Sequence, residues 1–424
     1  MKTSQRIIFL GILVLTSVMG LIASDIYLPA MPDIGNYLGT NDLEVKKTLS
    51  FFLLGLSFSQ LIYGPITDKF GRKKVLIFGT LLYTLASVLC STATNIQALI
   101  LFRFLQAVGA CSGMVIARAI VADLYSKEEG AKVFTTIFPI IGVSPAIAPV
   151  IGGLLTHYFS WRANFDFIAL LGVVILCLTI FCLKESLPQE KRHNISLGTI
   201  ARNYVSVLSN KLFLLYAILV CCAYGAYFAY LTNSSFLFST FGYQAKNIGF
   251  FYITLSIGYI SGNLLAKRII KTISIDKALW VGGSIFLLGG LVMLGVTLLD
   301  IKSITLIILS MSILTVGNGF LLPLGIISAM STSATKAGTA SGTIGFLQLG
   351  SASVFSFLVG ILSSNELHGI VSMILLANVT SIIALLTITA IQRKSLSLTK
   401  EPIPSPLLKN EFNEINKEIC KIEG

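Results

Sequence analysis

Long apolar runs recur along the whole chain, and no other feature restricts its fold as much. The first run, from Ile7 to Ala23, contains no charged residue. A helix needs about 20 apolar residues to cross a bilayer, and in lipid only helices and closed barrels satisfy all their backbone hydrogen bonds. The runs lack the strict alternation of barrel strands. The sequence therefore predicts an all-α membrane protein.

Composition supports this class. Only 12% of the 424 residues are charged and 54% are hydrophobic, whereas about a quarter are charged in a typical soluble protein. Run length and hydropathy predict about twelve transmembrane helices in two six-helix bundles. The expected spans are 7–27, 49–63, 75–91, 97–117, 133–155, 165–183, 212–232, 248–266, 278–299, 304–322, 340–362 and 370–390.

The net charge of +12 raises the question of a nucleic-acid partner. With the N-terminus inside, 25 of the 31 Lys and Arg residues fall in cytoplasmic segments. The positive-inside rule accounts for this distribution. We expect a lipid bilayer around the chain, both termini in the cytoplasm and no nucleic-acid partner.

The longest internal polar stretch, 184–211, separates two sets of six runs. This layout is typical of transporters built from two repeated halves, and the basic segments 64–74 and 267–277 follow equivalent spans. We expect an N-terminal bundle at 1–185, a cytoplasmic linker at 186–211, a C-terminal bundle at 212–391 and a solvated cytoplasmic tail at 392–424.

Enzyme chemistry finds little support. The three histidines lie far apart, no HExxH pattern occurs, and the dipeptide Gly-Lys of a phosphate-binding Walker loop is absent. We expect no enzyme activity, no metal and no cofactor. Any uphill transport would then use an ion gradient, and protons are the expected coupling ion.

Asp25 is the first charge after the Ile7–Ala23 run, and it has two interpretations. It lies about 18 residues into the span, which at ~1.5 Å per residue places it near the outer interface if the helix enters the membrane at Ile7. Alternatively, the apolar stretch that follows keeps it inside the membrane, with a kink at Pro29. An intramembrane carboxylate usually marks an ion or proton pathway.

Arg103 stands within another apolar run, where an arginine costs roughly 2.5–3.5 kcal/mol or more. It either faces the bundle interior or extends to the outer surface. The aromatic residues near Tyr224 suit a bulky apolar ligand, although such a group also serves packing or an interface belt. The candidate coupling residues are Asp25 and Arg103, and the candidate substrate-binding residues are Tyr27, Gln106, Tyr224, Tyr227 and Phe228.

Several motifs resemble the major facilitator superfamily. Gly64, Asp68, Gly71 and Arg72 match its Gly-x-x-x-Asp-x-x-Gly-Arg loop. "RFLQAVGA" (103–110) and "GVSPAIAPVIGG" (142–153) resemble motifs of its drug:proton antiporters, although Ala148 replaces a usual glycine. "SDIYLPAMP", "RAIVADLY" and "WRANF" resemble the bicyclomycin-resistance (Bcr/CflA) branch.

The resemblance implies that the loop at 64–74 locks the two bundles together on the cytoplasmic side when the site faces outward. Arg72 would pair with Asp123. Pro65 is expected to end its helix, the two glycines to allow a tight turn, and Asp68 to lie at a helix start. The fifth span is expected to bend and to pack closely. The candidate gating residues are Gly64, Asp68, Gly71, Arg72, Asp123, Pro145, Pro149, Gly152 and Gly153.

Together these features predict a proton-coupled exporter of drugs or other small amphipathic molecules in a bacterial inner membrane, acting as a monomer. An importer of a small solute on the same architecture is the alternative. A membrane sensor or scaffold without transport is the alternative of another class.

Overall fold

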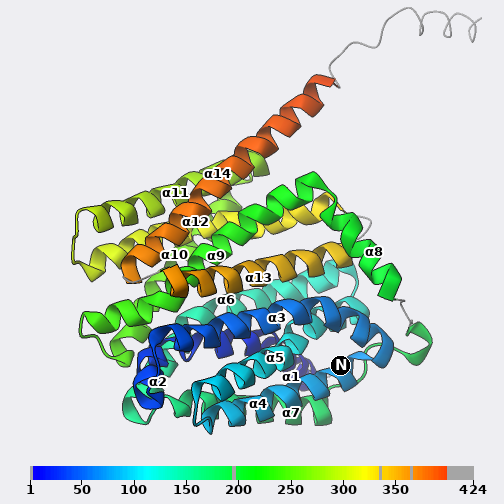
Figure 1. Ribbon diagram of the computed structural model, residues 1–424. Helices are drawn as coiled ribbons and strands as arrows, with labels where there is room; N and C mark the ends of the chain where they lie inside the picture. The colour runs from blue at the N-terminus through cyan, green and yellow to red at the C-terminus, as the bar shows by residue number, and fades with distance from the viewer. Residues whose placement is uncertain (1–2, 193–196, 334–336, 363–365, 399–424) are drawn as a thin grey trace, which may run out of the picture. The chain divides into compact units, whose positions relative to one another are not determined.

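The computed structural model describes residues 3–192, 197–333, 337–362 and 366–398, and every regular element in these ranges is a helix (Figure 1). This confirms the all-α prediction. The elements are α1 Thr3–Asp25, η1 Leu28–Ala30, α2 Met31–Leu38, α3 Asp42–Phe70, α4 Arg72–Ser91, α5 Ile96–Leu124, α6 Lys127–Tyr158, α7 Arg162–Cys182, η2 Gln189–Lys191, α8 Leu197–Leu208, α9 Lys211–Thr240, α10 Ala245–Ile269, α11 Ile275–Leu298, α12 Ile304–Ser331, α13 Ala337–Leu362 and α14 Glu366–Leu398.

Within the described ranges, eleven helical segments are long and apolar enough to cross a membrane. The expected span 133–155 lies on α6, a helix of 32 residues. Many helices extend well past the expected spans, because polar residues continue the helix beyond the apolar run as far as a capping residue. The side chain of Asn41, for example, accepts a hydrogen bond from the backbone N–H of Glu44 and starts α3.

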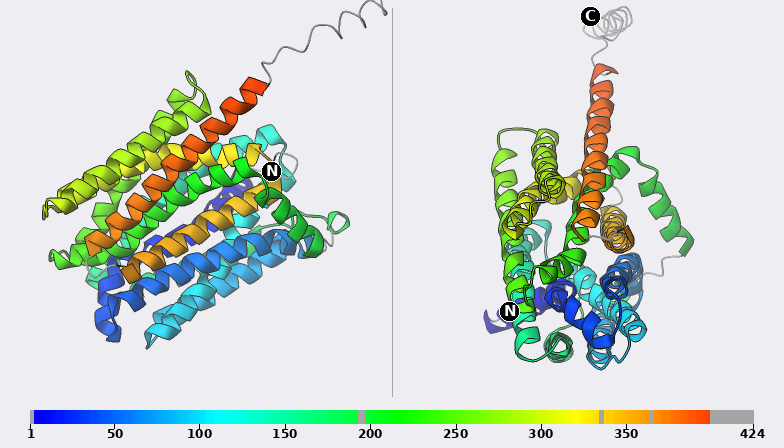
Figure 2. Two further views of the ribbon diagram at one scale, coloured as in Figure 1. Left: turned by 45° about the horizontal axis from the view of Figure 1, so that its top comes forward. Right: turned by 60° about the vertical axis from the view of Figure 1, so that its left-hand side comes forward.

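The chain divides into two compact units, Met1–Leu385 and Leu386–Gly424. In the second unit the described residues form the end of α14. In the first unit α3 lies beside α13, and α6 lies beside α10 (Figures 1 and 2). The Ser57 hydroxyl donates to the Phe346 carbonyl at 2.8 Å, and that of Ser353 to the Ser50 carbonyl at 2.8 Å. The division into two six-helix bundles stays a prediction.

The polar stretch 184–211 contains two short elements, η2 and α8, that were not predicted from the sequence. The Tyr204 hydroxyl on α8 donates to the Leu61 carbonyl of α3 at 3.3 Å. At the other end, α14 continues to Leu398, past the expected boundary at 391, and residues 399–424 of the expected tail lie outside the described ranges.

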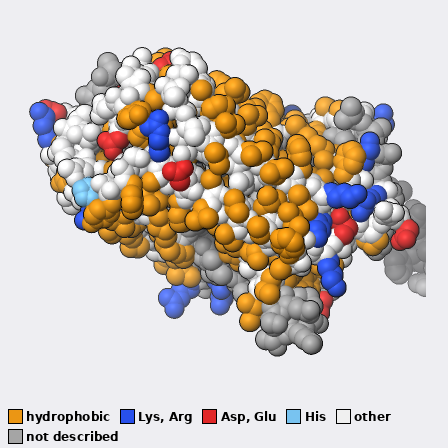
Figure 3. All heavy atoms as spheres, turned by 90° about the horizontal axis from the view of Figure 1, so that it is seen from below, with side chains coloured by type: hydrophobic (Ala, Val, Ile, Leu, Met, Phe, Trp, Pro, Cys, Tyr) orange, Lys and Arg blue, Asp and Glu red, His pale blue; other side chains and the backbone are white. Residues whose placement is uncertain are grey.

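Large apolar side chains are exposed along the candidate spans. In Figure 3 they cover the middle of the face shown, and most charged side chains gather toward either end of it. Leu170 on α7, for example, is 63% exposed. Exposing apolar surface to water costs about 25 cal/mol per Å². Contact of the same surface with lipid tails carries no such free-energy cost, so this surface fits a bilayer.

Candidate functional site

The first candidate span, Ile7–Leu38, is broken directly after Asp25. Here α1 ends, and the chain continues through η1 and α2. Pro29 and Pro32 occupy the first turns of η1 and α2, where a missing N–H removes no helical hydrogen bond. The break therefore precedes Pro29, and the prolines begin new helical pieces.

Asp25 lies inside this span and is only 4% exposed. One carboxylate oxygen accepts a hydrogen bond from the Ser24 hydroxyl at 2.7 Å. The backbone next to it is tightly covered, because a Cβ at Gly152 of α6 would stand 1.6 Å from the Ile26 carbonyl oxygen. Only glycine at position 152 lets α6 approach the break so closely.

Arg103 is fully buried. Its Nη1 donates to the Ala23 carbonyl at 3.0 Å and to the side-chain oxygen of Gln106. Its guanidinium carbon lies 4.1 Å from the ring centroid of Tyr27 and 4.0 Å from that of Phe52. This stacking between aromatic rings compensates part of the cost of burying a cation. Arg103 therefore faces the protein interior, and an extension to the outer surface does not match its position.

Tyr27 and Gln106, both expected to bind substrate, are buried partners of Arg103. The Gln106 amide donates to the Ser87 hydroxyl at 2.7 Å, which orients its oxygen toward the guanidinium. The Tyr27 hydroxyl lies 3.2 Å from that of Thr48. In this structure their contacts position the arginine.

Asp25 interacts electrostatically with Arg103, Tyr224 and Tyr227, so the structure brings predicted residues from α1, α5 and α9 into one region. Within the described residues Asp25 and Arg103 form no ion pair, and Nε and Nη2 of Arg103 lack a hydrogen-bond partner. Phe228 packs against both tyrosines, with ring centroids 4.9 Å and 5.6 Å away. We call Asp25, Arg103, Tyr224, Tyr227 and Phe228 the central cluster.

Two aromatic residues near this cluster were not predicted from the sequence. Phe52 of α3 stacks on Arg103, and Tyr252 of α10 interacts electrostatically with Asp25. The Tyr252 hydroxyl lies 2.8 Å from that of Ser234 and 2.9 Å from that of Ser235. Both aromatics stand in largely apolar stretches, where nothing in the sequence distinguishes them from packing residues.

Arg72 forms a second cluster, which we call the Arg72 cluster, with Thr67, Asp68, Asp123 and Glu185. Its Nε donates to Asp123 at 2.9 Å, and its Nη1 donates to Asp68 at 2.6 Å and to the Thr67 hydroxyl at 2.7 Å. The expected pairing of Arg72 with Asp123 is therefore present. Within the described residues, the polar partners of Arg72 all lie between positions 67 and 185. In this structure Arg72 therefore makes no polar contact with the second half of the chain.

The local structure of this loop differs from the expectation. Gly64, Pro65 and Asp68 all lie within α3, which continues to Phe70, so Pro65 does not end the helix and Asp68 is in the last turn. A Cβ at Gly64 would meet nothing within 4 Å, so no tight turn or close approach depends on it. The turn is Gly71 alone, whose φ of +93° favours glycine.

Glu185 was missed as a member of this cluster. Its carboxylate accepts the backbone N–H of Arg72 at 2.8 Å and that of Lys73 at 3.3 Å, and so caps the start of α4. A carboxylate is favourable at a helix N-terminus because the free N–H groups carry partial positive charge. Its distance in sequence from α4 hides this role.

The other predicted gating residues lie on α6. The Pro149 carbonyl would stand 2.4 Å from a Cβ at Gly249, and the Ala245 carbonyl 2.5 Å from one at Gly153. The expected close packing of this helix is therefore present, against α10. Pro145 lies about one turn before Pro149 on the same helix.

We predict that Arg72→Lys strongly reduces transport while leaving ligand affinity near that of the wild type. A lysine retains the charge but cannot contact Thr67, Asp68 and Asp123 together, because it lacks the forked guanidinium. Flux in vesicles and equilibrium ligand binding test this, with Lys74→Gln on the same helix as the control. Lost affinity with unchanged flux per bound ligand would contradict the assignment of Arg72 to gating.

A family model described as the Major Facilitator Superfamily matches residues 13–356. An uncharacterized MFS-type transporter of Bacillus subtilis, YdgK, is 32% identical over 360 residues, covering 84% of this chain and 89% of its own. A bicyclomycin resistance protein homolog of Haemophilus influenzae is 28% identical, covering 83% and 88%. Multidrug resistance protein D of Escherichia coli is 27% identical, covering 82% and 87%.

Solved structures share the fold. A bacterial homolog of the human lysosomal transporter Spinster, in an inward-facing and unoccupied conformation, has a TM-score of 0.72 at 13% identity, covering 94% of this chain and 98% of its own. The Escherichia coli xylose transporter XylE, partially occluded and inward open, has a TM-score of 0.69 at 12% identity, covering 91% and 97%. The chain is a multi-pass membrane transporter that belongs to the Major Facilitator Superfamily.

Proposed function

We propose that this protein is a proton-coupled exporter of small amphipathic molecules, built from twelve spans in two six-helix bundles of the bacterial inner membrane, with both termini in the cytoplasm. The observation that carries the proposal is the central cluster. A buried carboxylate at a helix break lies within electrostatic reach of a buried guanidinium and of tyrosines from the other half. Names of relatives that refer to bicyclomycin and multidrug resistance support export.

In the proposed cycle, substrate enters from the cytoplasm and contacts Tyr224, Tyr227 and Phe228. A proton from outside then neutralises Asp25 and favours release, and the proton leaves to the cytoplasm after the bundles rock back. Moving one charge down ~100 mV releases about 2.3 kcal/mol. Since 1.36 kcal/mol corresponds to about tenfold, one proton supports more than tenfold accumulation of a neutral compound outside.

An ion pair joins the N-terminal ends of α3 and α14, which lie on the outer side in the proposed topology. Lys46 Nζ lies 2.7 Å and 2.8 Å from the two carboxylate oxygens of Glu366, and 4.8 Å from the ring centroid of Phe236. The side chains are 3% and 17% exposed. We assign this pair as a latch that favours the inward-facing state and must break when the site opens outward.

We predict that Glu366→Gln increases the outward-open population. The substitution leaves the buried Lys46 without its counter-charge, and breaking a fully buried pair costs roughly 3–5 kcal/mol, less here because Glu366 is partly exposed. Distances between spin labels on the outer ends of α3 and α14 measure the shift. The double variant Lys46→Gln/Glu366→Gln should reverse part of it, and equal distributions in all three proteins would refute the latch.

The function itself is tested in vesicles that contain the purified protein, with a pH gradient imposed and a pH dye inside. Bicyclomycin and a panel of amphipathic antibiotics and dyes serve as substrates. Export coupled to protons predicts that an active compound and protons move in opposite directions. Movement in the same direction would indicate an importer. If deletion of the gene makes cells more sensitive to some compounds but none of these moves in the vesicles, a sensor or scaffold would be favoured.

A further inference from the structure

One face of α10 is an exposed apolar stripe. Phe250, Ile257 and Leu264 are 45%, 60% and 63% exposed, and they recur every seven residues, which is about two helical turns. Side chains at this spacing share one face. The stripe faces the lipid if the other sides of the helix are held against the protein.

Glycines on two other sides of the helix fix that orientation. A Cβ at Gly249 would stand 2.4 Å from the Pro149 carbonyl of α6, and one at Gly262 would stand 2.1 Å from the Val316 carbonyl of α12. Backbones this close leave no room for a side chain, so α10 cannot rotate about its axis. The apolar stripe is therefore the face turned away from the protein.

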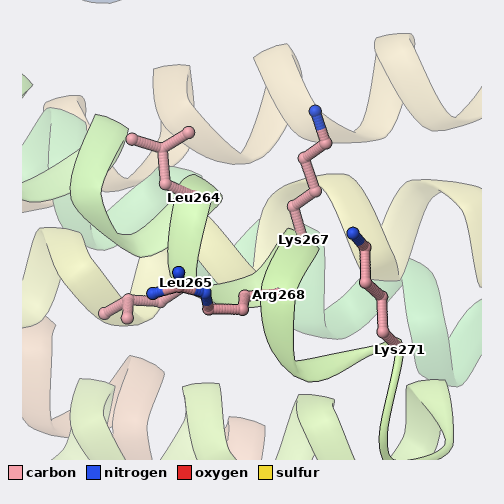
Figure 4. Close-up of a pocket in the computed structure, with 5 residues that line it drawn as sticks. All are labelled: Leu264, Leu265, Lys267, Arg268 and Lys271. Atoms are coloured by element: carbon pink, nitrogen blue, oxygen red, sulfur yellow. The ribbon is translucent and has the colours of Figure 1, made fainter.

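Three exposed cations follow Leu264 in the sequence. Lys267 and Arg268 lie in the last turn of α10, and Lys271 lies two residues beyond its end at Ile269. They line an open surface pocket of about 310 Å³ together with Leu264 and Leu265. Lys267 and Lys271 extend in the same direction, and Arg268 extends toward Leu265 (Figure 4). Within the described residues, none of the three forms an ion pair.

The helix dipole explains only part of this arrangement. Cations are favourable in the last turn of a helix, and Lys267 and Arg268 lie there. The dipole does not account for Lys271, which lies beyond the helix end, or for the exposed Leu264 and Leu265 beside the cations. An anionic phospholipid accounts for both, because its phosphate would lie at the cations and its acyl chains at the leucines.

The end of α10 that carries these cations faces the cytoplasm in the topology that the distribution of Lys and Arg favours. The cytoplasmic leaflet is the one rich in anionic lipids, and basic pockets at this level bind their headgroups. We propose that Leu264, Leu265, Lys267, Arg268 and Lys271 form a binding site for one anionic phospholipid of the inner leaflet. A soluble phosphate would not use the two leucines.

The test uses the full chain in nanodiscs of mixed phosphatidylglycerol and phosphatidylcholine, with retained lipid counted by native mass spectrometry. Lys267→Gln/Arg268→Gln/Lys271→Gln should lose one tightly held phosphatidylglycerol. Each basic residue near an anionic surface contributes roughly fivefold, so affinity should fall on the order of 100-fold. Phosphatidylcholine binding should not change.

A matched control removes three other exposed cations expected on the cytoplasmic side, as Lys74→Gln/Lys184→Gln/Arg202→Gln. It should keep the lipid that the first variant loses. Leu264→Asn/Leu265→Asn should weaken lipid retention as well, because the acyl contact is removed while the charge stays.

Three results would overturn the proposal. Equal phosphatidylglycerol retention by wild type and the first variant would show that no such site exists. An equal loss in the control would show general attraction of anionic lipid to a basic surface. Full displacement by soluble glycerol phosphate would show a site for free phosphate. Thermal unfolding of each variant in detergent separates these results from misfolding.

Discussion

Asp25→Asn is expected to reduce proton-driven export to the level of protein-free vesicles while the protein still folds and binds substrate. The amide retains the size of the carboxylate and can still accept the Ser24 hydrogen bond. It cannot gain or lose a proton. Because Asp25 is buried at a helix break near Arg103, it is the described acid best placed to couple protonation to the state of both halves.

The measurement is substrate flux under an imposed pH gradient, paired with counterflow at equal pH on both sides. Counterflow exchanges substrate without net proton movement, so Asp25→Asn should retain it. Asp33→Asn serves as the control, since Asp33 lies on the same candidate span but is exposed. Normal gradient-driven flux in a well-inserted Asp25→Asn protein would exclude Asp25 as the coupling residue.

The helical fold was predictable because bilayer thickness and backbone hydrogen bonding leave few choices for long apolar runs. Local breaks were harder to place. Pro65 was expected to end its helix, but it lies within α3, as prolines in membrane helices often do, and the turn falls at Gly71. Near Asp25, the first helix ends before Pro29 and not at it.

Charge made part of the candidate site visible in the sequence. Asp25 and Arg103 were singled out because ionised groups are rare within apolar runs. Their surroundings depend on tertiary contacts between distant segments, so Phe52 and Tyr252 could not be distinguished from packing residues. Glu185 likewise caps α4 from a position more than 100 residues away.

Arg103→Lys is expected to lose most transport, although it conserves the charge. In the structure the guanidinium is stacked by Tyr27 and Phe52 and donates to the Ala23 carbonyl and to Gln106. An ammonium group lacks both the flat faces and the forked donors that this geometry needs. Arg103→Met retains a long, unbranched side chain but removes the charge that acts on Asp25, so it should abolish export.

The two variants should also differ in pH dependence. The cation favours ionised Asp25, so in Arg103→Met the pH profile of substrate binding should shift to higher pH, whereas Arg103→Lys should stay near the wild-type profile. Arg162 provides a matched control, because its guanidinium also stacks on aromatic rings, at 4.4 Å from Tyr37 and 4.3 Å from Trp161. Arg162→Lys should keep both flux and profile. If Arg103 is coupled to Asp25, at least the neutral variant Arg103→Met must change the flux or the pH profile. Wild-type flux and pH profiles in both Arg103 variants would therefore mean that the buried arginine only holds neighbouring helices together.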